Sequence, residues 1–307
     1  MRVRAPVAIL GPTASGKSAV AMAAARAVEG IEVVSVDSMQ VYRGMDIGTA
    51  KATPAQRAEV RHHLLDLVDP WDEVSVAEFQ AAYRDAFAEL TGRGARALLV
   101  GGTGLYLRAV VDGLEIPPQW PAHRRELEEE AAAVGPAALH ARLAALDPVA
   151  ASRMEPTNTR RVVRALEVCL GSGRRFSSFG PGLDTYPSTD VVQIALRWER
   201  AALGARIDRR VGEMIAAGLL DEVRALLAHP LGMSRTARQA LGYKELIGHI
   251  EGHVGLDDAV AAIAQRTRQF AVRQERWFQR DPRLRFVDVE SDPVAEALPQ
   301  VLAALSD

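Results

Sequence analysis

The sequence predicts an α/β fold in which a parallel sheet, covered by helices, is interrupted by an inserted helical domain. Short apolar runs of the kind found in buried strands recur along the 307 residues and alternate with helical stretches, as expected for a parallel sheet. Between residues 114 and 189 this alternation gives way to helical spacing. We therefore expect a core domain of residues 1–113 and 190–307 and an inserted helical domain of residues 114–189.

The core domain begins with a strand, a loop and a helix. Residues 7–10 form an apolar, strand-like run, and beyond a glycine loop the alanine-rich residues 18–28 have the composition of a helix. Helical patterns dominate from the fourth strand to about Gln279, and the later strand-like runs cover residues 33–36, 97–100, 191–196 and 286–289. Because ligands gather at the carboxyl ends of parallel strands, the loops after the first three strands should share one edge of the sheet.

Prolines and glycines mark the limits of the insertion. Pro117, Pro118 and Pro121 break the chain at its start, and a link rich in glycine, proline and serine covers residues 180–188 at its end. Between them, residues 122–173 are almost wholly helical in spacing and rich in alanine, leucine, arginine and glutamate. This pattern is typical of a separate helical domain.

The overall charge argues against a nucleic-acid partner, because the formal net charge is −2 and the pI is about 6.4. Two segments depart from this average. Residues 153–175 carry six arginines against two acids, and residues 264–285 carry seven against two. Each cluster could present a positive face to phosphates. Since only three lysines accompany the many arginines, the clusters can also reflect a general bias of the sequence toward arginine.

Membrane association is not expected from the sequence. No apolar run approaches the roughly 18 residues that a membrane span needs, and the N-terminus lacks the layout of a signal peptide. We therefore expect a cytoplasmic protein with no membrane partner. The single cysteine, Cys169, lies in an apolar run and is expected to be a buried, inert thiol.

The loop after the first strand has the pattern of a P-loop, with a strand before it and a helix after it. In such a loop, backbone N–H groups and the helix N-terminus hold a diphosphate, the lysine neutralises it, and the serine hydroxyl ligates Mg²⁺. We therefore expect a P-loop NTPase-like core with Mg²⁺ as cofactor and Ser18 as its ligand, while leaving open whether the phosphate ligand is a nucleotide such as ATP. The expected diphosphate-binding residues are Gly11, Pro12, Thr13, Ala14, Ser15, Gly16, Lys17 and Ser18.

A carboxylate is missing where a P-loop ATPase or kinase would carry one. Such proteins hold Mg²⁺ with an acid near the end of an apolar strand, but the strand at residues 97–100 ends in Gly101, Gly102 and Thr103. The strand-terminal carboxylate near the P-loop is Asp37, which follows the second strand. Asp37 is therefore a candidate general base or substrate anchor, with a capping or surface aspartate as the alternative.

Six segments share an ordered pattern that extends from the P-loop to about Trp277. Together they resemble the signature of tRNA dimethylallyltransferases. The match includes the helical insertion, and the motifs are specific in combination. The segments are residues 35–42 (SVDSMQVY), 44–51 (GMDIGTAK), 62–66 (HHLLD), 101–106 (GGTGLY), 161–164 (RVVR) and 242–245 (GYKE).

The resemblance implies that the diphosphate is a leaving group and not a phosphoryl donor. It implies that Asp37 accepts a proton from the exocyclic N6 amine of the adenosine immediately 3′ of the anticodon, while that amine attacks C1 of dimethylallyl diphosphate. Pyrophosphate then leaves, stabilised by Lys17, Mg²⁺ and Arg210. Thr103 is implied to contact substrate. From the residues alone, Arg210 could also lie on a solvated helix face and Thr103 could cap the next helix.

The resemblance also implies that the insertion binds a tRNA anticodon stem-loop, from which the target base is extruded. Arg160 and Arg164 are spaced to share one face of a helix. One departure from the family pattern is Val272, where many relatives carry a lysine. His62 and His63 are expected to be structural or rim residues. The residues implied to contact tRNA are Asp37, Ser38, Met39, Gln40, Thr103, Arg124, Arg160, Arg161, Arg164, Gln239, Gly242, Tyr243, Lys244 and Arg273.

Three other functions remain open from the sequence alone. A P-loop kinase of small molecules would share the P-loop and Asp37 but would not require an arginine-rich insertion. A transferase acting on free adenine nucleotides would not need the insertion, and an RNA-binding ATPase would hydrolyse ATP without prenyl transfer. For the transferase we expect tRNA and dimethylallyl diphosphate as partners and a monomeric protein.

Overall fold

The structure is a computed structural model that describes residues 4–180 and 182–306. In this part of the chain six strands form one sheet in the order β3-β2-β4-β1-β5-β6, and every neighbouring pair is parallel. The predicted α/β class with a parallel core is confirmed. The strands are β1 (Val7–Leu10), β2 (Ile31–Val36), β3 (His62–His63), β4 (Arg96–Gly101), β5 (Val192–Trp198) and β6 (Arg285–Val289).

The strand register brings the first three predicted loops to one edge of the sheet. Gly101, the last residue of β4, is paired with Leu10 of β1 on one side and with Val36 of β2 on the other. The residues that follow these three positions therefore lie side by side. The P-loop, Asp37 and the loop of Thr103 share this edge, as the sequence predicts.

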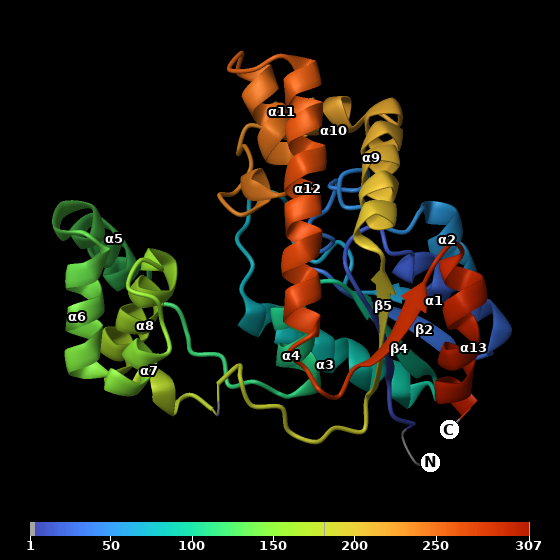
Figure 1. Cartoon of the computed structure of the whole chain (residues 1–307), viewed down its shortest axis with the longest axis horizontal. Coiled ribbons are helices and arrows are strands. Elements are labelled where there is room, and N and C mark those ends of the chain that lie inside the picture. Colours follow the sequence, from blue (N-terminus) through green and yellow to red (C-terminus); the bar gives the residue numbers. More distant parts are fainter. Residues whose placement is uncertain (1–3, 181, 307) are drawn as a thin grey trace. The chain divides into compact units, whose positions relative to one another are not determined.

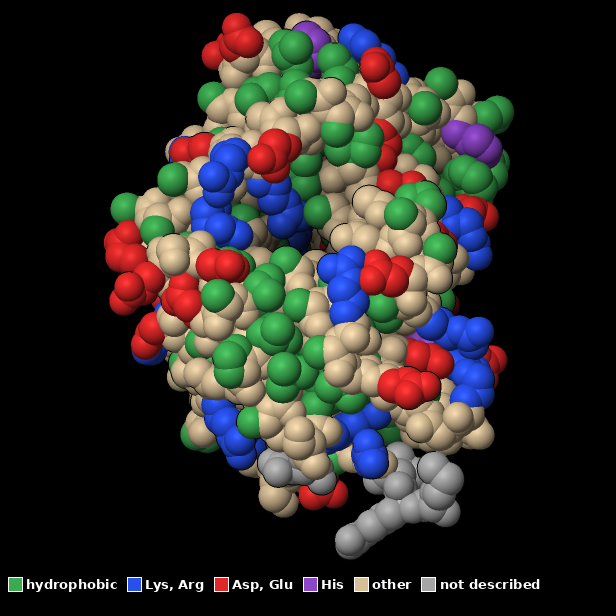
Figure 2. Space-filling view, turned by 90° about the vertical axis from the view of Figure 1, so that its right-hand side faces the viewer, with side chains coloured by type: hydrophobic (Ala, Val, Ile, Leu, Met, Phe, Trp, Pro, Cys, Tyr) green, Lys and Arg blue, Asp and Glu red, His purple; other side chains and the backbone are tan. Residues whose placement is uncertain are grey.

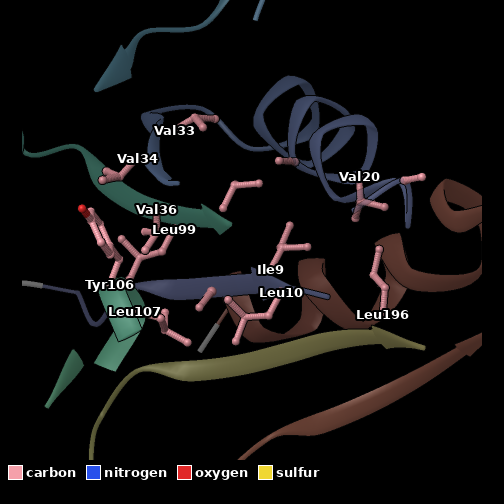
Figure 3. Close-up of a cluster of buried hydrophobic side chains, with 14 of the residues drawn as sticks. Ile9, Leu10, Val20, Val33, Val34, Val36, Leu99, Tyr106, Leu107 and Leu196 are labelled. Atoms are coloured by element: carbon pink, nitrogen blue, oxygen red, sulfur yellow. The ribbon is translucent and has the colours of Figure 1, made fainter. Parts of the chain in front are cut away.

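The central strand β1 is buried on both faces because helices cover both sides of the sheet. Helix α1 (Lys17–Ala27) packs against α13 (Pro293–Ser306) on one face, and α3 (Val76–Gly92) packs against α4 (Gly104–Val111) on the other (Figure 1). Figure 3 shows Ile9 and Leu10 pointing to opposite sides of β1, as alternation along a strand requires. These two side chains are at most 1% exposed.

A second group of helices extends beyond the carboxyl ends of the strands (Figure 1). Helix α12 packs against both α9 and α11, and α10 packs against α9 and α11. This group provides a wall opposite the edge of the sheet that holds the P-loop. Its helices are α9 (Arg200–Ala216), α10 (Leu219–Leu227), α11 (Tyr243–Ile250) and α12 (Leu256–Phe278).

The chain divides into two compact units, which we call the core unit (Met1–Val111 and Ser188–Asp307) and the helical unit (Asp112–Pro187). The boundaries predicted from the sequence lie close to these positions. The helical unit has its own apolar core, which includes Leu127, Leu139 and Leu166. Its helices are α5 (Pro121–Val134), α6 (Pro136–Leu146), α7 (Pro148–Ser152) and α8 (Thr159–Ser172).

Prolines divide the helical unit into short helices. Pro121, Pro136 and Pro148 each stand in the first turn of a helix, where the missing N–H would have no intrahelical partner. The long helical stretch predicted from spacing is therefore four helices. In the described residues, no helix has the length and apolar character that crossing a membrane requires.

Candidate functional site

A cavity of about 450 Å³, which we call the site cavity, lies in the core unit at the carboxyl ends of β1, β2 and β4. Helices α9 and α12 contribute the opposite wall. The cavity brings together most of the site residues predicted in the core unit. Those on its lining are Thr13, Lys17, Ser18, Asp37, Ser38, Met39, Gln40, Thr103, Arg210, Gln239, Gly242 and Arg273.

The lining of the site cavity combines charged and apolar side chains. The P-loop, Asp37 and Arg210 supply charged and polar groups, and α9 and α12 also supply large apolar side chains. A ligand that carries a charged group beside a hydrocarbon chain matches this combination. The apolar lining residues include Ile207, Val211, Met214, Leu219, Ile263 and Phe270.

The P-loop adopts a strained backbone that the sequence makes possible. Gly11, Ala14 and Gly16 have φ angles of 143°, 62° and 95°. A Cβ atom on Gly16 would lie 2.4 Å from Cγ of Pro293, so no larger residue fits there. A left-handed conformation costs an alanine about 1–2 kcal/mol, and other contacts must therefore hold Ala14 in place.

Two side chains from outside the loop provide those contacts. Nε1 of Trp198 donates a hydrogen bond to the carbonyl oxygen of Ser15 (3.0 Å), and Nε of Arg206 donates to the carbonyl oxygen of Ala14 (2.9 Å). The Arg206 guanidinium also lies 4.3 Å from the centre of the Trp198 ring. The predicted residues Gly11, Pro12, Ala14, Ser15 and Gly16 do not line the cavity and form the framework of the loop.

Lys17 and Arg210 place two cations beside one carboxylate. Nζ of Lys17 donates to the carbonyl oxygen of Pro12 (2.7 Å). Burial and the nearby Arg210 lower the pKa of Lys17 to about 7, while Asp37 acts in the opposite direction. Burial also lowers the pKa of Arg210, against the attraction of Asp37 and Glu213. An anion bound here would favour the charged form of Lys17.

Asp37 is oriented by the turn that follows it. Its Oδ1 accepts hydrogen bonds from the backbone N–H groups of Met39 (2.8 Å) and Gln40 (3.4 Å), which fixes the carboxylate at the cavity wall. Thr103 Oγ1 accepts a hydrogen bond from Ser38 N (3.3 Å). The hydroxyl of Thr103 thus links the end of β4 to the turn that carries Asp37.

Gln40 and Tyr243 have contacts that the sequence did not predict. Gln40 Nε2 donates to the carbonyl oxygen of Thr49 (3.0 Å), so this side chain supports the cavity wall. The Tyr243 side chain is 0% exposed, and its hydroxyl donates to Glu222 Oε1 (2.5 Å). Burial and the nearby Glu222 raise the pKa of Tyr243 above its usual range. Its neighbour Lys244 is exposed.

The four arginines of the helical unit that are predicted to contact tRNA fall into two groups. Arg160 and Arg161 are exposed in the first turn of α8. Arg124 and Arg164 both pair with the fully buried carboxylate of Glu167, at 2.7 Å and 2.9 Å. Arg124 and Arg164 therefore stabilise the helical unit through Glu167. A role in binding tRNA stays a prediction for all four arginines.

Figure 2 shows a hollow in the surface with Lys and Arg side chains at part of its rim, on two different sides. Within the described residues, no group of three or more His, Cys, Asp and Glu side chains could hold a metal ion. A divalent ion at Ser18 would therefore depend on oxygens of a phosphate ligand, as is usual for Mg²⁺.

Two structural contributors were missed by the sequence analysis. Glu222 accepts hydrogen bonds from the backbone N–H groups of Asp46 (3.0 Å) and Ile47 (2.8 Å), and Gln274 bridges two loops of the cavity. Both stand on helices among other polar residues. Helical spacing gave no sign that they face loops distant in sequence.

Comparison with known proteins gives a consistent family. A model of the IPP transferase family matches residues 40–281. The tRNA dimethylallyltransferase of Kineococcus radiotolerans is 49% identical over 97% of this chain and 98% of its own length. That of Streptomyces avermitilis is 48% identical over 97% of this chain and 95% of its own length. The chain belongs to the IPP transferase family.

Solved structures of similar proteins support this membership. A tRNA isopentenylpyrophosphate transferase from Bacillus halodurans is 38% identical, with a TM-score of 0.70 over 99% of this chain and 97% of its own. A eukaryotic dimethylallyltransferase acting on tRNA is 25% identical, with a TM-score of 0.81 over 99% of this chain and 79% of its own. The family model begins at Gln40, so the P-loop and Asp37 are covered by the nearly full-length relatives alone.

Proposed function

We propose that this chain transfers the dimethylallyl group of dimethylallyl diphosphate to N6 of the adenosine 3′ of the anticodon in tRNA, releasing pyrophosphate. The observation that carries the proposal is the site cavity, which joins a P-loop, a strand-end carboxylate and an apolar wall. An ATP-dependent kinase would not need that apolar wall. The relatives named above act on tRNA or are named for this transfer.

The diphosphate binds to the P-loop in this proposal. The N-terminus of α1, where Lys17 and Ser18 line the cavity, faces the anion, and Lys17 and Arg210 supply positive charge beside it. Negative charge on the diphosphate increases as the bond between C1 and oxygen breaks. Preorganised cations therefore stabilise the transition state more than the ground state.

Asp37 is the general base of the proposed reaction. The N6 amine of the adenosine attacks C1 of the dimethylallyl group, the C1–oxygen bond breaks, and its electron pair leaves with pyrophosphate. The amine loses one proton to the carboxylate of Asp37. Thr103, which is tied to the Asp37 turn through Ser38, contacts the substrate at the same wall.

Mg²⁺ is the proposed cofactor. Ser18 lines the cavity in the first turn of α1, so its hydroxyl can take one coordination position while diphosphate oxygens and water take the others. When bound there, Mg²⁺ neutralises part of the charge of the diphosphate. The chelator EDTA should therefore abolish transfer.

An anticodon stem-loop is the proposed macromolecular partner. Exposed basic side chains support this in each unit taken separately: Arg160 and Arg161 in the helical unit, and Lys244 and Arg273 in the core unit. The net charge of −2 makes such local clusters necessary for binding phosphates. A cytoplasmic location and a monomeric state belong to the same proposal.

The test is incubation of the purified protein with Mg²⁺, labelled dimethylallyl diphosphate and unmodified tRNA. We expect label in the tRNA, and Asp37→Asn should lower kcat at least about 100-fold, because a general base contributes about 10²–10⁴. The matched control is Asp221→Asn, since the Asp221 side chain is 79% exposed and pairs with Arg224 on the surface. A parallel incubation receives ATP in place of dimethylallyl diphosphate: consumption of ATP there, with no transfer of label in the first reaction, would show a kinase or ATPase instead.

A further inference from the structure

Gln274 of α12 contacts two loops of the site cavity at once. The residue is 7% exposed. Its Oε1 accepts a hydrogen bond from the backbone N–H of Thr13 in the P-loop (2.9 Å), and its Nε2 donates to the carbonyl oxygen of Gly102 after β4 (2.8 Å). One amide therefore ties the loop that binds diphosphate to the loop that carries Thr103.

The loop after β4 is shaped to receive α12. A Cβ atom on Gly102 would lie 2.4 Å from Nε2 of Gln274, and one on Gly104 would lie 2.0 Å from Nε1 of Trp277. Neither glycine has a positive φ. At Gly104 a side chain would overlap the Trp277 ring, and at Gly102 a methyl group would displace the amide of Gln274 from its position. Space and not backbone conformation therefore favours glycine at both positions.

The chemistry of an amide suits this place better than that of an acid. In P-loop ATPases an acid near the end of such a strand holds Mg²⁺, whereas here Gln274 fills the space beside Gly102. An amide offers one acceptor for the N–H of Thr13 and one donor for the carbonyl of Gly102. A carboxylate would leave that carbonyl without a donor and would add negative charge beside the diphosphate.

We propose that Gln274 is a positioning residue for the transfer reaction, which holds the diphosphate loop and the Thr103 loop at a fixed separation. This inference rests on the proposed function. Thr103 is bonded to the turn of Asp37 through Ser38 N (3.3 Å), so a shift at Gly102 displaces the general base relative to the leaving group. Misplacement of reacting groups by about 1 Å can cost about 100-fold in rate.

The test compares Gln274→Met and Gln274→Glu with a matched control, Gln279→Met. Gln279 lies at the end of the same helix but is exposed. Both Gln274 variants should lower kcat about 10- to 100-fold and leave KM for tRNA within about threefold. Gln274→Met removes the partner of both the Thr13 N–H and the Gly102 carbonyl, whereas Gln274→Glu removes the donor to the Gly102 carbonyl and adds a negative charge near the chemistry. The Kd of inorganic pyrophosphate with Mg²⁺ should rise about tenfold, and the control should match wild type in both measurements.

A second set of variants changes the same contact from the loop after β4, first with α12 unaltered and then in combination with Gln274→Ala. Gly102→Ala should displace the amide of Gln274 from the other side and lower kcat to a similar extent. In the double variant Gly102→Ala/Gln274→Ala the methyl group enters the space that the shortened side chain leaves. The double variant should therefore be no slower than Gln274→Ala alone, which is a strongly non-additive result for neighbouring residues.

Three outcomes would overturn the inference. One is a lower melting temperature in the Gln274 variants with kcat and pyrophosphate Kd unchanged, which would indicate a purely structural role. Another is additive loss in the double variant, and a third is an equal loss in Gln279→Met. If the wild type transfers no prenyl group, the proposed function fails, and the pyrophosphate Kd of the same variants then decides whether Gln274 positions the P-loop.

Discussion

The three lysines of the chain occupy three different environments. Lys17 lies at the site cavity with a lowered pKa. The Lys51 side chain is 0% exposed, and its Nζ lies 2.6 Å from Asp46 Oδ1 and 2.7 Å from Asp66 Oδ1. Lys244 is exposed on α11. Removal of the charge should therefore affect kcat at Lys17 and folding stability at Lys51, whereas at Lys244 it should affect neither of these and only weaken the proposed binding of tRNA.

Substitution of each lysine by methionine tests this division. Lys17→Met should lower kcat about 10²–10³-fold at an unchanged melting temperature, because it removes charge that stabilises the leaving diphosphate. Lys51→Met should cost about 2–3 kcal/mol of unfolding free energy, less than for a fully enclosed pair because both aspartates reach water. Lys244→Met should change stability by less than about 0.5 kcal/mol. Urea unfolding measures the stability of the three variants, and steady-state kinetics measures their kcat. A stability loss confined to Lys17→Met would contradict the proposed division between a catalytic Lys17 and a structural Lys51.

Asp147 makes the stability of the helical unit sensitive to acid. Burial favours the neutral form, but hydrogen bonds from Ser177 and Ala150 outweigh it and hold the pKa of Asp147 below its usual range. Because the folded pKa is the lower one, the carboxylate stabilises the fold above the unfolded pKa of about 3.9, and this contribution is lost as pH falls through the folded pKa. Urea unfolding between pH 3 and 6 should show a flatter pH dependence for Asp147→Asn than for wild type; parallel curves would refute the prediction.

At the scale of elements, α10 and α11 hold the loop around residue 47 through one carboxylate. Glu222 accepts from Ile47 N (2.8 Å) and from the Tyr243 hydroxyl (2.5 Å), while the Tyr243 ring packs so closely on Gly48 that a Cβ there would lie 2.4 Å away. Helices of the α9–α12 group thereby define one wall of the site cavity.

Tyr243→Phe separates this structural role from a role in binding tRNA. It keeps the ring but removes the hydroxyl, and should lower the unfolding free energy by about 1.5–3 kcal/mol, as for a hydrogen bond to a charged group. The salt dependence of tRNA binding should stay unchanged, because the side chain is 0% exposed. Arg273→Ala is the matched comparison: it should reduce the slope of log K for tRNA binding against log salt concentration by about one. A reduced slope for Tyr243→Phe would instead support the contact between Tyr243 and tRNA that the resemblance implies.

The sequence predicted those strands that are buried on both faces, because burial gives them a run of apolar residues. Strands β1 and β4 are apolar because helices cover both faces, and their apolar runs marked them within a residue or two. Strand β3 consists of His62 and His63 alone, which carry no such pattern. The sequence singled out Lys17 and Asp37, which both line the site cavity, because phosphate and proton chemistry favours those residue types beside strand ends; their roles stay predictions. The contacts of Gln274 could not be predicted from the sequence, because they depend on helix packing across the fold.

For the whole molecule, the division into two units predicts two unfolding events. The helical unit has its own apolar core, in which Leu139 is 0% exposed, and the proposed ligand site lies entirely in the core unit. Pyrophosphate with Mg²⁺ at about 100 times its Kd should stabilise the core unit by about 2.7 kcal/mol. Leu139→Ala should instead destabilise the helical unit by about 2–5 kcal/mol.

Differential scanning calorimetry of the full chain distinguishes these effects. We expect two transitions, of which pyrophosphate raises one and Leu139→Ala lowers the other, since a ligand stabilises only the unit whose unfolding destroys its site. The matched change in the core unit is Leu98→Ala, because Leu98 in β4 is likewise 0% exposed and its loss should lower the transition that pyrophosphate raises. A single transition that responds to both changes would mean that the helical unit unfolds together with the core unit, and the insertion would then be an extension of the catalytic fold and not a domain with a stability of its own.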